Sequence, residues 1–395
     1  MKSKLLCLVL LILLAACSTK VQKEEREFVK EVYPGVIHKQ IIDQRDTLFI
    51  NILKIDLRRE DYHLQAIKAS DSLLGRETVS AMVERLNDSG KEVIAAINSD
   101  FFIITEGGEP ENNLVINSQF VKGTPETDSE YDTFDNIHYQ FAVTETGKLI
   151  IDRFKFTGNL ILNDDSVFRI NRINSRTDSS SITFYNFYQG TKTPKADNGE
   201  EIYELSLTPL FEKSDTNFYI ISKQLNSRGG NEIESGSVIL SANYETADSL
   251  EKNISPGDTV KALFGLSPSD EQVITATGGW GKIVEAGKNV AGRVDSVEGT
   301  FPKFSAAKHP RTGIGISKDG NHVYFITVDG RQAISGGATL KEFAELMIDE
   351  GVFEGLNFDG GGSTTMVVDG NIVNSPSDKT GERSVGIGLA LIRKK

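Results

Sequence analysis

The segment LNFDGGGSTTMVVDGNIVN, residues 356–374, places one acid, three glycines and three hydroxyl side chains between two apolar runs. The run before the motif indicates a strand, and the run after it predicts a hairpin that turns at Asp369-Gly370. DGGGST therefore connects two strands at the edge of a sheet. Glycines can take positive φ angles and leave their amides uncovered, so the backbone of Gly360–Gly362 could converge on an anion. The alternative is a tight turn in which Asp359 accepts hydrogen bonds from its own backbone.

The segments just before this motif have regular local signals. TGIGIS and HVYFITV flank Asp319-Gly320 and predict another hairpin. TLKEFAELMIDEG predicts a helix, because Thr339 and Glu342 form a capping box and Gly351 suits the position after the last turn.

Strands also dominate the first half of the chain. The stretches at residues 47–56, 62–69 and 92–98 indicate strands, and apolar residues at helical spacing between Val79 and Leu86 indicate a helix. Residues 154–243 are rich in Ser, Thr, Asn and short β-branched runs, which favours hairpins. We therefore expect an α+β fold with a large mixed β-sheet core, flanking helices and a β-hairpin-rich middle section.

The N-terminus has the pattern of an export signal. Lys2 and Lys4 precede an apolar run of 13 residues, Leu5–Cys17, whereas a membrane-spanning helix needs roughly 20. The ending LAAC resembles the lipobox of bacterial lipoproteins, so we expect a lipid on Cys17; the alternative is an ordinary signal peptide with an incidental cysteine. The expected protein is a lipoprotein of the cell envelope, on its periplasmic or surface face, that contacts the membrane only through its lipid. The expected divisions are a signal peptide (1–17), a polar tether (18–45) and a single domain (46–395).

Composition excludes several classes of protein. The chain has 395 residues, 38% of them hydrophobic, which is enough for a substantial core. Its formal net charge is −13, and it becomes −15 without Lys2 and Lys4, because 41 basic residues then oppose 56 acidic ones. We therefore expect no nucleic-acid partner. Both cysteines, Cys7 and Cys17, precede the expected domain, which excludes a disulfide or a cysteine-based metal site within it.

Three further motifs place charged residues at the ends of predicted strands. HPRTG puts Arg311 before a strand, VDGRQ puts Asp329 and Arg331 after one, and GERS puts Glu382 and Arg383 before another. Each alone is more often part of a surface ion pair. Together with the glycine motif, they indicate a pocket for a phosphate-bearing ligand.

The order of several segments resembles that of the phosphodiester glycosidase family. These segments are AAINSDFF, TFYNFYQGTKT, ATGGWGKIVEAGK, KHPRTGIGI, TVDGRQAISGGATLKEFAELM, LNFDGGGSTTMVVDGNIVNSPSD and GERSVGIGLALI. The resemblance extends over roughly residues 47–392, and DGGGSTTM together with HPRT and VDGR is its most specific part. The chain departs from the expected pattern at Ser99, where glycine is expected, and at Trp280, where proline or a smaller residue is expected. Ser99 could narrow the site, and Trp280 could stack on a sugar ring.

The resemblance implies a hydrolase that cleaves the C1–O bond of a phosphate-linked sugar and leaves a phosphate monoester. This leaving group needs little proton assistance, so cations and N–H donors can stabilise its charge instead. Asp359 is the expected nucleophile or general base, with Asp329 or Glu382 as its partner. The expected ligand-binding residues are Arg311, Arg331, Arg383, Gly360, Gly361, Gly362, Ser363, Thr364, Asn98, Asp100 and His309.

Some roles stay open at this stage. Asn98 and Asp100 could bind sugar hydroxyls, which is the favoured role, or a divalent cation such as calcium, the one cofactor considered. His309 either fixes its loop or takes part in catalysis, since an ordinary histidine has a pKa near 6.5. Two other functions remain: a metal-dependent phosphodiesterase that cleaves the P–O bond, and a non-catalytic glycan-binding surface lipoprotein. The sequence leaves the oligomeric state open.

Overall fold

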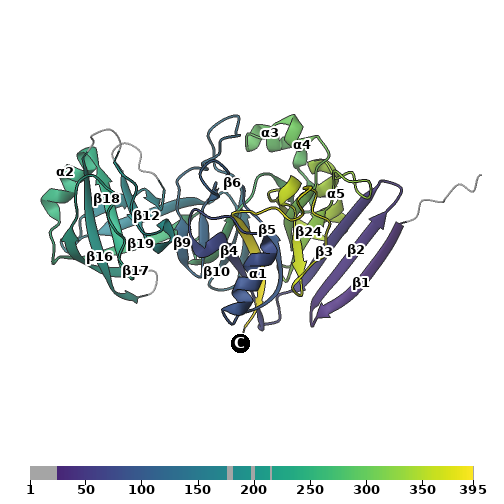
Figure 1. Cartoon of the computed structure of the whole chain (residues 1–395), viewed down its shortest axis with the longest axis horizontal. Helices are drawn as coiled ribbons and strands as arrows, with labels where there is room; N and C mark the ends of the chain where they lie inside the picture. Colours follow the sequence, from purple (N-terminus) through teal and green to yellow (C-terminus); the bar gives the residue numbers. More distant parts are fainter. Residues whose placement is uncertain (1–24, 176–180, 197–200, 214–215, 395) are drawn as a thin grey trace, which may run out of the picture.

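Two stacked sheets form the larger lobe of the molecule, on the right in Figure 1. The computed structural model describes residues 25–175, 181–196, 201–213 and 216–394. Apolar side chains of the two sheets, among them Leu53, Phe325, Ile94 and Leu389, share one core cluster. The first sheet has the order β1 (Glu25–Tyr33), β2 (Val36–Asp43), β3 (Leu48–Asp56), β24 (His322–Val328), β23 (Arg311–Ser317), β25 (Val352–Asn357), β21 (Lys282–Glu285) and β22 (Lys288–Asn289). The second has the order β27 (Asn371–Ile372), β26 (Met366–Val368), β5 (Glu92–Asn98), β28 (Ile387–Arg393) and β4 (Tyr62–Lys68).

Helices cover the outer faces of both sheets. The apolar face of α5 (Leu340–Asp349) packs on the first sheet, and its N-terminus has the predicted capping box of Thr339 and Glu342. The apolar face of α1 (Val79–Asp88) packs on the second sheet. The shorter helices are α3 (Val294–Val297), α4 (Pro302–Ser305) and the 3-10 turns η1 (Ala69–Asp71), η2 (Phe187–Gln189), η3 (Ala291–Arg293) and η4 (Gly361–Ser363).

A third sheet joins this lobe to a smaller one. Its order is β11 (Leu149–Asp152), β10 (Gln140–Thr144), β20 (Val273–Gly278), β8 (Leu114–Ile116) and β9 (Gln119–Lys122), and the short pair β6 (Phe102–Ile103) and β7 (Glu109–Pro110) lies beside it. The smaller lobe, on the left in Figure 1, contains the remaining strands and α2 (Tyr244–Asn253). Its sheet has the order β13 (Val167–Ile170), β12 (Lys155–Ile161), β19 (Thr259–Ser267), β17 (Thr216–Gln224), β16 (Ile202–Lys213), β18 (Val238–Asn243), β15 (Ile182–Tyr185) and β14 (Arg172–Ile173).

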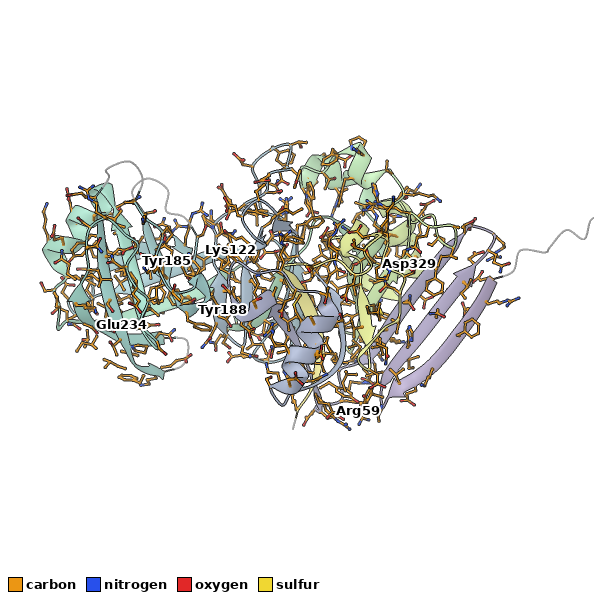
Figure 2. All side chains as sticks on the ribbon, in the orientation of Figure 1. Arg59, Lys122, Tyr185, Tyr188, Glu234 and Asp329 are labelled. Atoms are coloured by element: carbon orange, nitrogen blue, oxygen red, sulfur yellow. The ribbon has the colours of Figure 1, made fainter. Side chains whose placement is uncertain are left out.

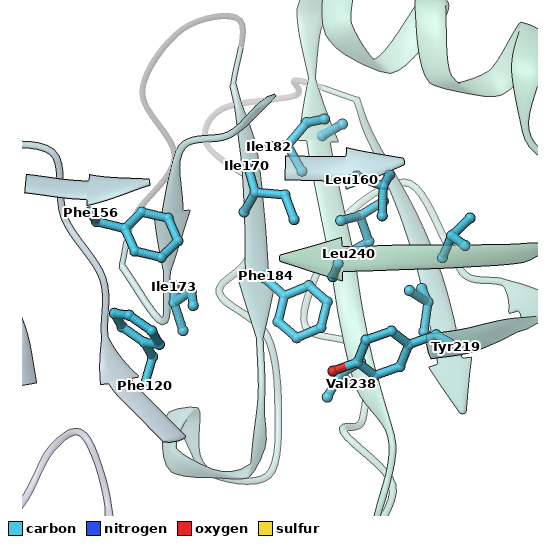
Figure 3. Packing of buried hydrophobic residues seen from close by; sticks show 14 of the residues in the cluster. Phe120, Phe156, Leu160, Ile170, Ile173, Ile182, Phe184, Tyr219, Val238 and Leu240 are labelled. Carbon is cyan, nitrogen blue, oxygen red and sulfur yellow. The ribbon is translucent and has the colours of Figure 1, made fainter. Parts of the chain in front are cut away.

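The third sheet contributes side chains to the cores of both lobes, for example Ala142 to the smaller lobe and Phe141 to the larger one. The core cluster of the smaller lobe, part of which Figure 3 shows, includes Val115, Phe120, Ala142 and Ala276 from the third sheet. The expected fold class is confirmed: α+β, with β-sheet cores, flanking helices and a hairpin-rich middle section. The strand pairings are antiparallel except for β14 with β15, which run parallel.

The expected polar tether over residues 18–45 is wrong where the structure describes it. Residues 25–33 and 36–43 form the antiparallel strands β1 and β2, and β2 pairs with β3 along its whole length. A polar sequence can form a strand here because β1 is an edge strand and most of its side chains face solvent. Residues 1–24, including the expected signal peptide and Cys17, lie outside the described residues.

Polar side chains replace apolar ones at one end of the core between the stacked sheets. Alternate residues of β24 face this core, so Thr327 follows Phe325, and Asp329 comes directly after the strand. Thr312 and Asn51, their neighbours on β23 and β3, are also fully buried. The glycine motif lies at this polar end.

Candidate active site

The DGGGST motif connects β25 to β26, as the sequence predicted. The Asp359 N–H donates to the Ser99 carbonyl (2.8 Å), and the Gly361 N–H donates to the Pro310 carbonyl (2.9 Å). Ser99 follows β5 and Pro310 precedes β23, so the motif is held between ends of both stacked sheets.

Each glycine of the motif is required either by its backbone conformation or by the close approach of a neighbouring group. Gly361 has a φ of +63°, a left-handed conformation that favours glycine. A Cβ atom on Gly360 would lie 2.6 Å from the Pro310 carbonyl oxygen, and one on Gly362 would lie 2.1 Å from Nη2 of Arg383. The motif is therefore closely approached on two sides, by backbone and by an arginine.

Three amides of the motif are used within the fold. The Gly361 N–H donates to the Pro310 carbonyl, and the N–H groups of Ser363 and Thr364 donate to the carbonyls of Gly360 and Gly361 (3.2 and 3.3 Å). The predicted anion-binding row of Gly360–Gly362 therefore lacks its central amide, and side chains must supply the charge for an anionic ligand.

Two of the three predicted arginines contact the motif. The Arg331 guanidinium lies over Gly361, where a Cβ atom would be 3.1 Å from its Nη2. Arg331 is exposed, and within the described part of the chain it forms no ion pair with a carboxylate. Arg383 lies beside Gly362, but it donates to both carboxylate oxygens of Asp378 (2.8 and 3.1 Å). Arg331 is therefore the better placed cation for an anionic ligand.

Arg311 has a different position from the one expected. It is 1% exposed, and its Nε and Nη2 donate to the carbonyls of Ala338, Phe304 and Ala307 (2.9, 2.7 and 3.1 Å). Its guanidinium also lies 5.3 Å from the centre of the Phe304 ring. These contacts favour a role for Arg311 as a support for the loop before β23 over the predicted binding of phosphate.

His309 fixes the position of Arg331. Its Nε2 donates to the Lys303 carbonyl (2.9 Å), and its Nδ1 accepts a hydrogen bond from Nη2 of Arg331 (3.2 Å). Burial, together with the nearby charge of Arg311, lowers the pKa of His309. The neutral imidazole that this favours is the form that can accept from a guanidinium. Of the two roles predicted for His309, the geometry favours the fixing of a loop.

Asp359 has the electrostatics of a reactive carboxyl group. It is partly buried, and burial raises its pKa to about 6. The Ser363 hydroxyl, the charge of Arg383, the Gly360 amide and the charge of Arg331 act in the opposite direction. Asp359 is thus ionised near neutral pH but close enough to its pKa to take up a proton.

The two carboxyl groups predicted as partners of Asp359 have structural contacts instead. The Asp329 carboxylate accepts from Asn374 Nδ2 (3.1 Å) and from the Ser375 N–H (2.8 Å), and its side chain is fully buried at the end of β24 (Figure 2). Glu382 accepts from the N–H and the hydroxyl of Ser80, in the first turn of α1. The sequence placed both residues correctly at strand ends. Their carboxylates, however, hold a loop in the case of Asp329 and the first turn of a helix in the case of Glu382.

Asn98 and Asp100 are also occupied by the protein itself. Oδ1 of Asn98 accepts from the Thr312 hydroxyl (2.8 Å) and the Thr365 N–H (3.1 Å), and its Nδ2 donates to the Asp359 carbonyl (2.6 Å). Asp100 is 1% exposed and accepts from the side chain and the N–H of Asn112 (2.8 and 3.1 Å). Asn98 positions the reactive loop and Asp100 holds Asn112, and these contacts favour structural roles over the expected contact with sugar hydroxyls or a cation.

Glu111 is a candidate residue that the sequence analysis missed. It is 2% exposed, its N–H donates to the Phe101 carbonyl (3.1 Å), and its Oε2 has no hydrogen-bond partner among the described residues. Burial raises the pKa of Glu111 well above the ordinary value, and the charges of Asp100, Asp132 and Asp359 raise it further. Burial therefore favours the protonated form of the Glu111 carboxyl group, and the charge of Asp359 is one of the influences that act on it. No local motif marks Glu111, because its role depends on contacts distant in sequence.

Phenylalanine side chains lie next to these carboxyl groups. Phe101, Phe301 and Phe304 are partly exposed, and their rings surround Trp280 at centroid distances of 5.5, 6.1 and 4.8 Å. Trp280 itself is 2% exposed and stacks on His138, so it is not available to a sugar ring. The departure at Ser99 does not narrow the site either, because its hydroxyl bonds Thr277 (2.8 Å) in the interior.

The hydroxyl groups of the motif point inward. Ser363, Thr364 and Thr365 are 0–1% exposed. The Ser363 hydroxyl is close enough to Asp359 to lower the pKa of its carboxyl group, although Oγ of Ser363, like Oγ1 of Thr364 and of Thr365, has no hydrogen bond of good geometry in the described part of the chain. Ser363 therefore acts on the carboxyl group rather than on an open phosphate pocket.

A metal centre has no evident ligand set in the described residues. Among residues 25–175, 181–196, 201–213 and 216–394, no three His, Cys, Asp or Glu side chains are grouped so that they could hold an ion. The site consists instead of Asp359, Glu111 and Arg331, supported by His309 and Arg383.

These features define a β-rich fold with a partly buried carboxyl group beside a guanidinium that no described carboxylate pairs with, and comparison with known proteins relates part of the chain to a family. Residues 214–392 match the model of the phosphodiester glycosidase family, which confirms the resemblance over this range. The matched range contains Arg331, Asp359 and Arg383, and Glu111 lies outside it.

Curated relatives align over short stretches. Over 80 residues the chain is 40% identical to human N-acetylglucosamine-1-phosphodiester alpha-N-acetylglucosaminidase, which is 20% of this chain and 15% of the human one. Over 71 residues it is 44% identical to an uncharacterised prophage-derived protein of Bacillus subtilis, which is 18% of this chain and 11% of that one. The chain thus aligns with well under a fifth of the length of these relatives.

Solved structures share the fold over most of the chain. A hypothetical protein from Synechocystis superposes with a TM-score of 0.70 at 16% identity, over 93% of this chain and 64% of that one. A protein from Burkholderia pseudomallei gives a TM-score of 0.64 at 20% identity, over 90% of this chain and 74% of that one.

Proposed function

We propose that this protein is an exported, lipid-anchored glycosidase that hydrolyses the sugar C1–O bond of sugar-1-phosphodiesters in glycans or cell-envelope polymers. One observation carries the proposal: Asp359, with its pKa raised to about 6, lies in a glycine loop beside Arg331, a cation that no described carboxylate neutralises. The match of residues 214–392 to the phosphodiester glycosidase family supports the same reaction.

In the proposed reaction, arginines bind the phosphate and carboxyl groups act on the sugar and the water. Arg331, oriented by His309, binds the phosphate, and Arg383 adds a weaker attraction because Asp378 shares its charge. The C1–O bond breaks with its electron pair leaving on the phosphate oxygen, where the guanidinium stabilises the new charge. The Asp359 carboxylate either attacks C1 or takes the proton of the water that attacks it. Glu111 holds a proton that it can share with the departing oxygen or with Asp359.

Hydrolysis in ¹⁸O-labelled water tests this assignment against its main alternative. A panel of sugar-1-phosphodiesters should release a phosphate monoester without label and a sugar that carries the label, with or without chelator. Label on the phosphate, together with loss of activity in chelator, would instead identify a metal-dependent phosphodiesterase.

Asp359→Asn separates an enzyme from a glycan-binding protein. This variant should fold and bind substrate but lose turnover by several orders of magnitude. If no member of the panel is hydrolysed by the wild type, and both proteins bind glycans equally, the non-catalytic alternative would be correct.

The lipid anchor is tested separately. In the described part of the chain, no helix is long and apolar enough to cross a bilayer. If the lipid on Cys17 is the attachment, Cys17→Ala should release the protein from the membrane fraction or stop its maturation. Equal membrane retention of wild type and variant, measured by fractionation, would refute the anchor and leave the hydrolase proposal unaffected.

A further inference from the structure

A concave site lies in the smaller lobe, away from the candidate active site. It forms where the turn between β8 and β9 meets the hairpin of β16 and β17. A cavity of about 380 Å³ is lined mainly by aromatic and aliphatic side chains. A more polar cavity of about 140 Å³ adjoins it, and the two share Ser118, Gln119, Phe120, Glu212, Asn217 and Phe264. Together these two cavities form what we call the lobe groove. Volumes of this size are typical of small-molecule sites.

The apolar half of the lobe groove offers aromatic rings to a ligand. Phe120, Phe184 and Tyr219 line this half and belong to the hydrophobic core of the lobe, part of which Figure 3 shows. At its rim Phe187 is 52% exposed and Phe211 is 57% exposed, and the Phe211 ring stacks on Phe218 with centroids 4.4 Å apart. Exposed rings held by stacked partners are suited to binding a flat apolar surface.

The polar half provides hydrogen-bonding groups without a cation. Within the described part of the chain, the side chains of Gln119, Glu212 and Asn217 take part in no hydrogen bond. No described residue that lines either cavity is Lys or Arg, and the protein has a formal net charge of −13. Phosphate and other anionic ligands are therefore disfavoured. A purely apolar chain would leave the amides and the carboxylate unused, whereas a neutral polyhydroxylated ligand uses both halves.

One short strand runs from the lobe groove toward the segment that carries Glu111. β9 begins at Gln119 in the groove and ends at Lys122, about 10 Å further along at the usual rise of a strand. Nζ of Lys122 donates to the carbonyl of Pro110 (2.7 Å), the residue before Glu111. Figure 2 shows Lys122 at the junction of the two lobes.

We propose that the lobe groove binds an uncharged stretch of a glycan, with sugar rings against Phe211 and Phe187 and hydroxyls on Gln119, Glu212 and Asn217. The choice of a glycan rests on the proposed function, because the neighbouring site would then act on a phosphate-linked sugar of the same molecule. The groove thereby supplies affinity for the polymer, and Asp359 and Arg331 supply chemistry.

Calorimetry on the full chain carrying Asp359→Asn tests binding without turnover. The probes are maltohexaose, mannohexaose and chitohexaose as neutral glycans, and dodecanoate as an apolar chain. At least one hexasaccharide should bind, Phe211→Ala should weaken it tenfold or more, and Asn217→Ala should weaken it severalfold. Val167→Ala is the matched control, since Val167 is 60% exposed on the same sheet but does not line the groove.

The outcomes separate this proposal from the proposed function. Phe211→Ala in the wild-type background should hydrolyse a small sugar-1-phosphodiester at the normal rate, because such a substrate does not reach the groove. Hexasaccharide binding in a protein that hydrolyses nothing would overturn the enzyme but keep the groove. The groove proposal is overturned if no hexasaccharide binds, if binding is unaffected by Phe211→Ala, or if dodecanoate alone binds in a Phe211-dependent way.

Discussion

Arg331 is the residue on which the proposed phosphate site depends. It has a φ of +58°, an unusual conformation for a residue other than glycine, and the hydrogen bond from its Nη2 to His309 holds its side chain in place. Such strain persists where the surroundings determine the conformation, and it is concentrated at functional sites.

Substitution of Arg331 should therefore affect binding and not folding. Arg331→Gln removes a charge-assisted contact of about 1.5–3 kcal/mol, so kcat/KM for a sugar-1-phosphodiester should fall by roughly 10- to 150-fold. His309→Ala should raise KM to a smaller extent, because it frees the guanidinium without removing it. Arg58→Gln, at an exposed ion pair with Asp56, is the control. Normal kinetics in Arg331→Gln, together with a loss in Arg311→Ala at unchanged melting temperature, would return the phosphate site to Arg311.

The carboxyl groups of Asp359 and Glu111 predict the pH dependence of the reaction. Asp359 must be ionised and its pKa is raised to about 6, so kcat/KM should fall as the pH decreases through about 6. Glu111 must be protonated, and its pKa is also raised, so the rate should fall again at higher pH. Glu111→Gln should abolish the alkaline limb and keep the acidic one. A profile with an unchanged alkaline limb in this variant would exclude Glu111 from proton transfer.

At the scale of elements, the glycine motif packs against backbone on one side and against flexible side chains on the other. On one side a backbone oxygen of Pro310 lies against Gly360, and on the other the ends of the Arg383 and Asp378 side chains lie against Gly362. Backbone moves only with its strand, whereas a long side chain can change rotamer.

Two alanine substitutions should distinguish these sides. Gly360→Ala forces the loop away from β23 and should destabilise the protein by about 1–3 kcal/mol, as overpacking does. Gly362→Ala should displace Arg383 from Asp378, which raises KM with a smaller loss of stability. Urea unfolding and steady-state kinetics on both variants measure the two effects, and Gly320→Ala, in an open turn with a φ of +70°, controls for backbone strain alone. Equal changes in both quantities for the two variants would contradict this division.

Elements whose signals are local could be predicted from the sequence. The hairpins at Asp319-Gly320 and Asp369-Gly370 and the helix capped by Thr339 depend on turn and cap residues that are neighbours in the chain, and the structure contains all three. The polar β1 was missed, because an edge strand needs no apolar face.

For the site, the positions of charged residues at strand ends predicted which of them come close together, but they did not predict the hydrogen-bond partners of each side chain. Asp359, Arg331 and Arg383 do come together at the motif, as expected. Arg311, Asp329 and Glu382 also lie at strand ends, yet carbonyls, Asn374 and Ser80 use their polar atoms. These partners come from distant segments, and Glu111 acquires its charge environment in the same way. Burial and pairing of this kind follow from the tertiary fold, and no local motif encodes them.

At the scale of the whole molecule, buried carboxyl groups make stability depend on pH. The pKa of Asp100 is raised to about 7, and the pKa values of Asp329 and Asp359 to about 6, in each case by burial. The folded protein therefore retains protons that the unfolded chain releases above its ordinary pKa, near 3.9. The free energy of unfolding should thus decrease as the pH rises from about 4 to 7.

Melting temperatures measured across this range test the effect. They should be several degrees higher at pH 5 than at pH 8. Asp56, whose pKa is lowered to about 2 by its hydrogen bond with Arg58, has the opposite sign, but it acts below this window. The histidines His38, His63 and His309, whose pKa values are lowered by burial, also have the opposite sign and reduce the decrease near pH 6. A melting temperature that rises from pH 5 to pH 8 would show that these carboxyl groups are not proton-binding in the folded state.

The Asn98 amide, which joins Thr312, Thr365 and Asp359, bears on how such a protein can diversify. Because one side chain connects both sheets to the reactive loop, a change there alters the geometry of the acid and the integrity of the interior together. Amino-acid substitutions that the protein can tolerate must therefore lie elsewhere. Such places are the exposed loop of Arg331, the partly exposed phenylalanines and the smaller lobe. A population selected in the laboratory for a new substrate should accumulate its substitutions in those outer regions and leave the Asn98 junction unchanged.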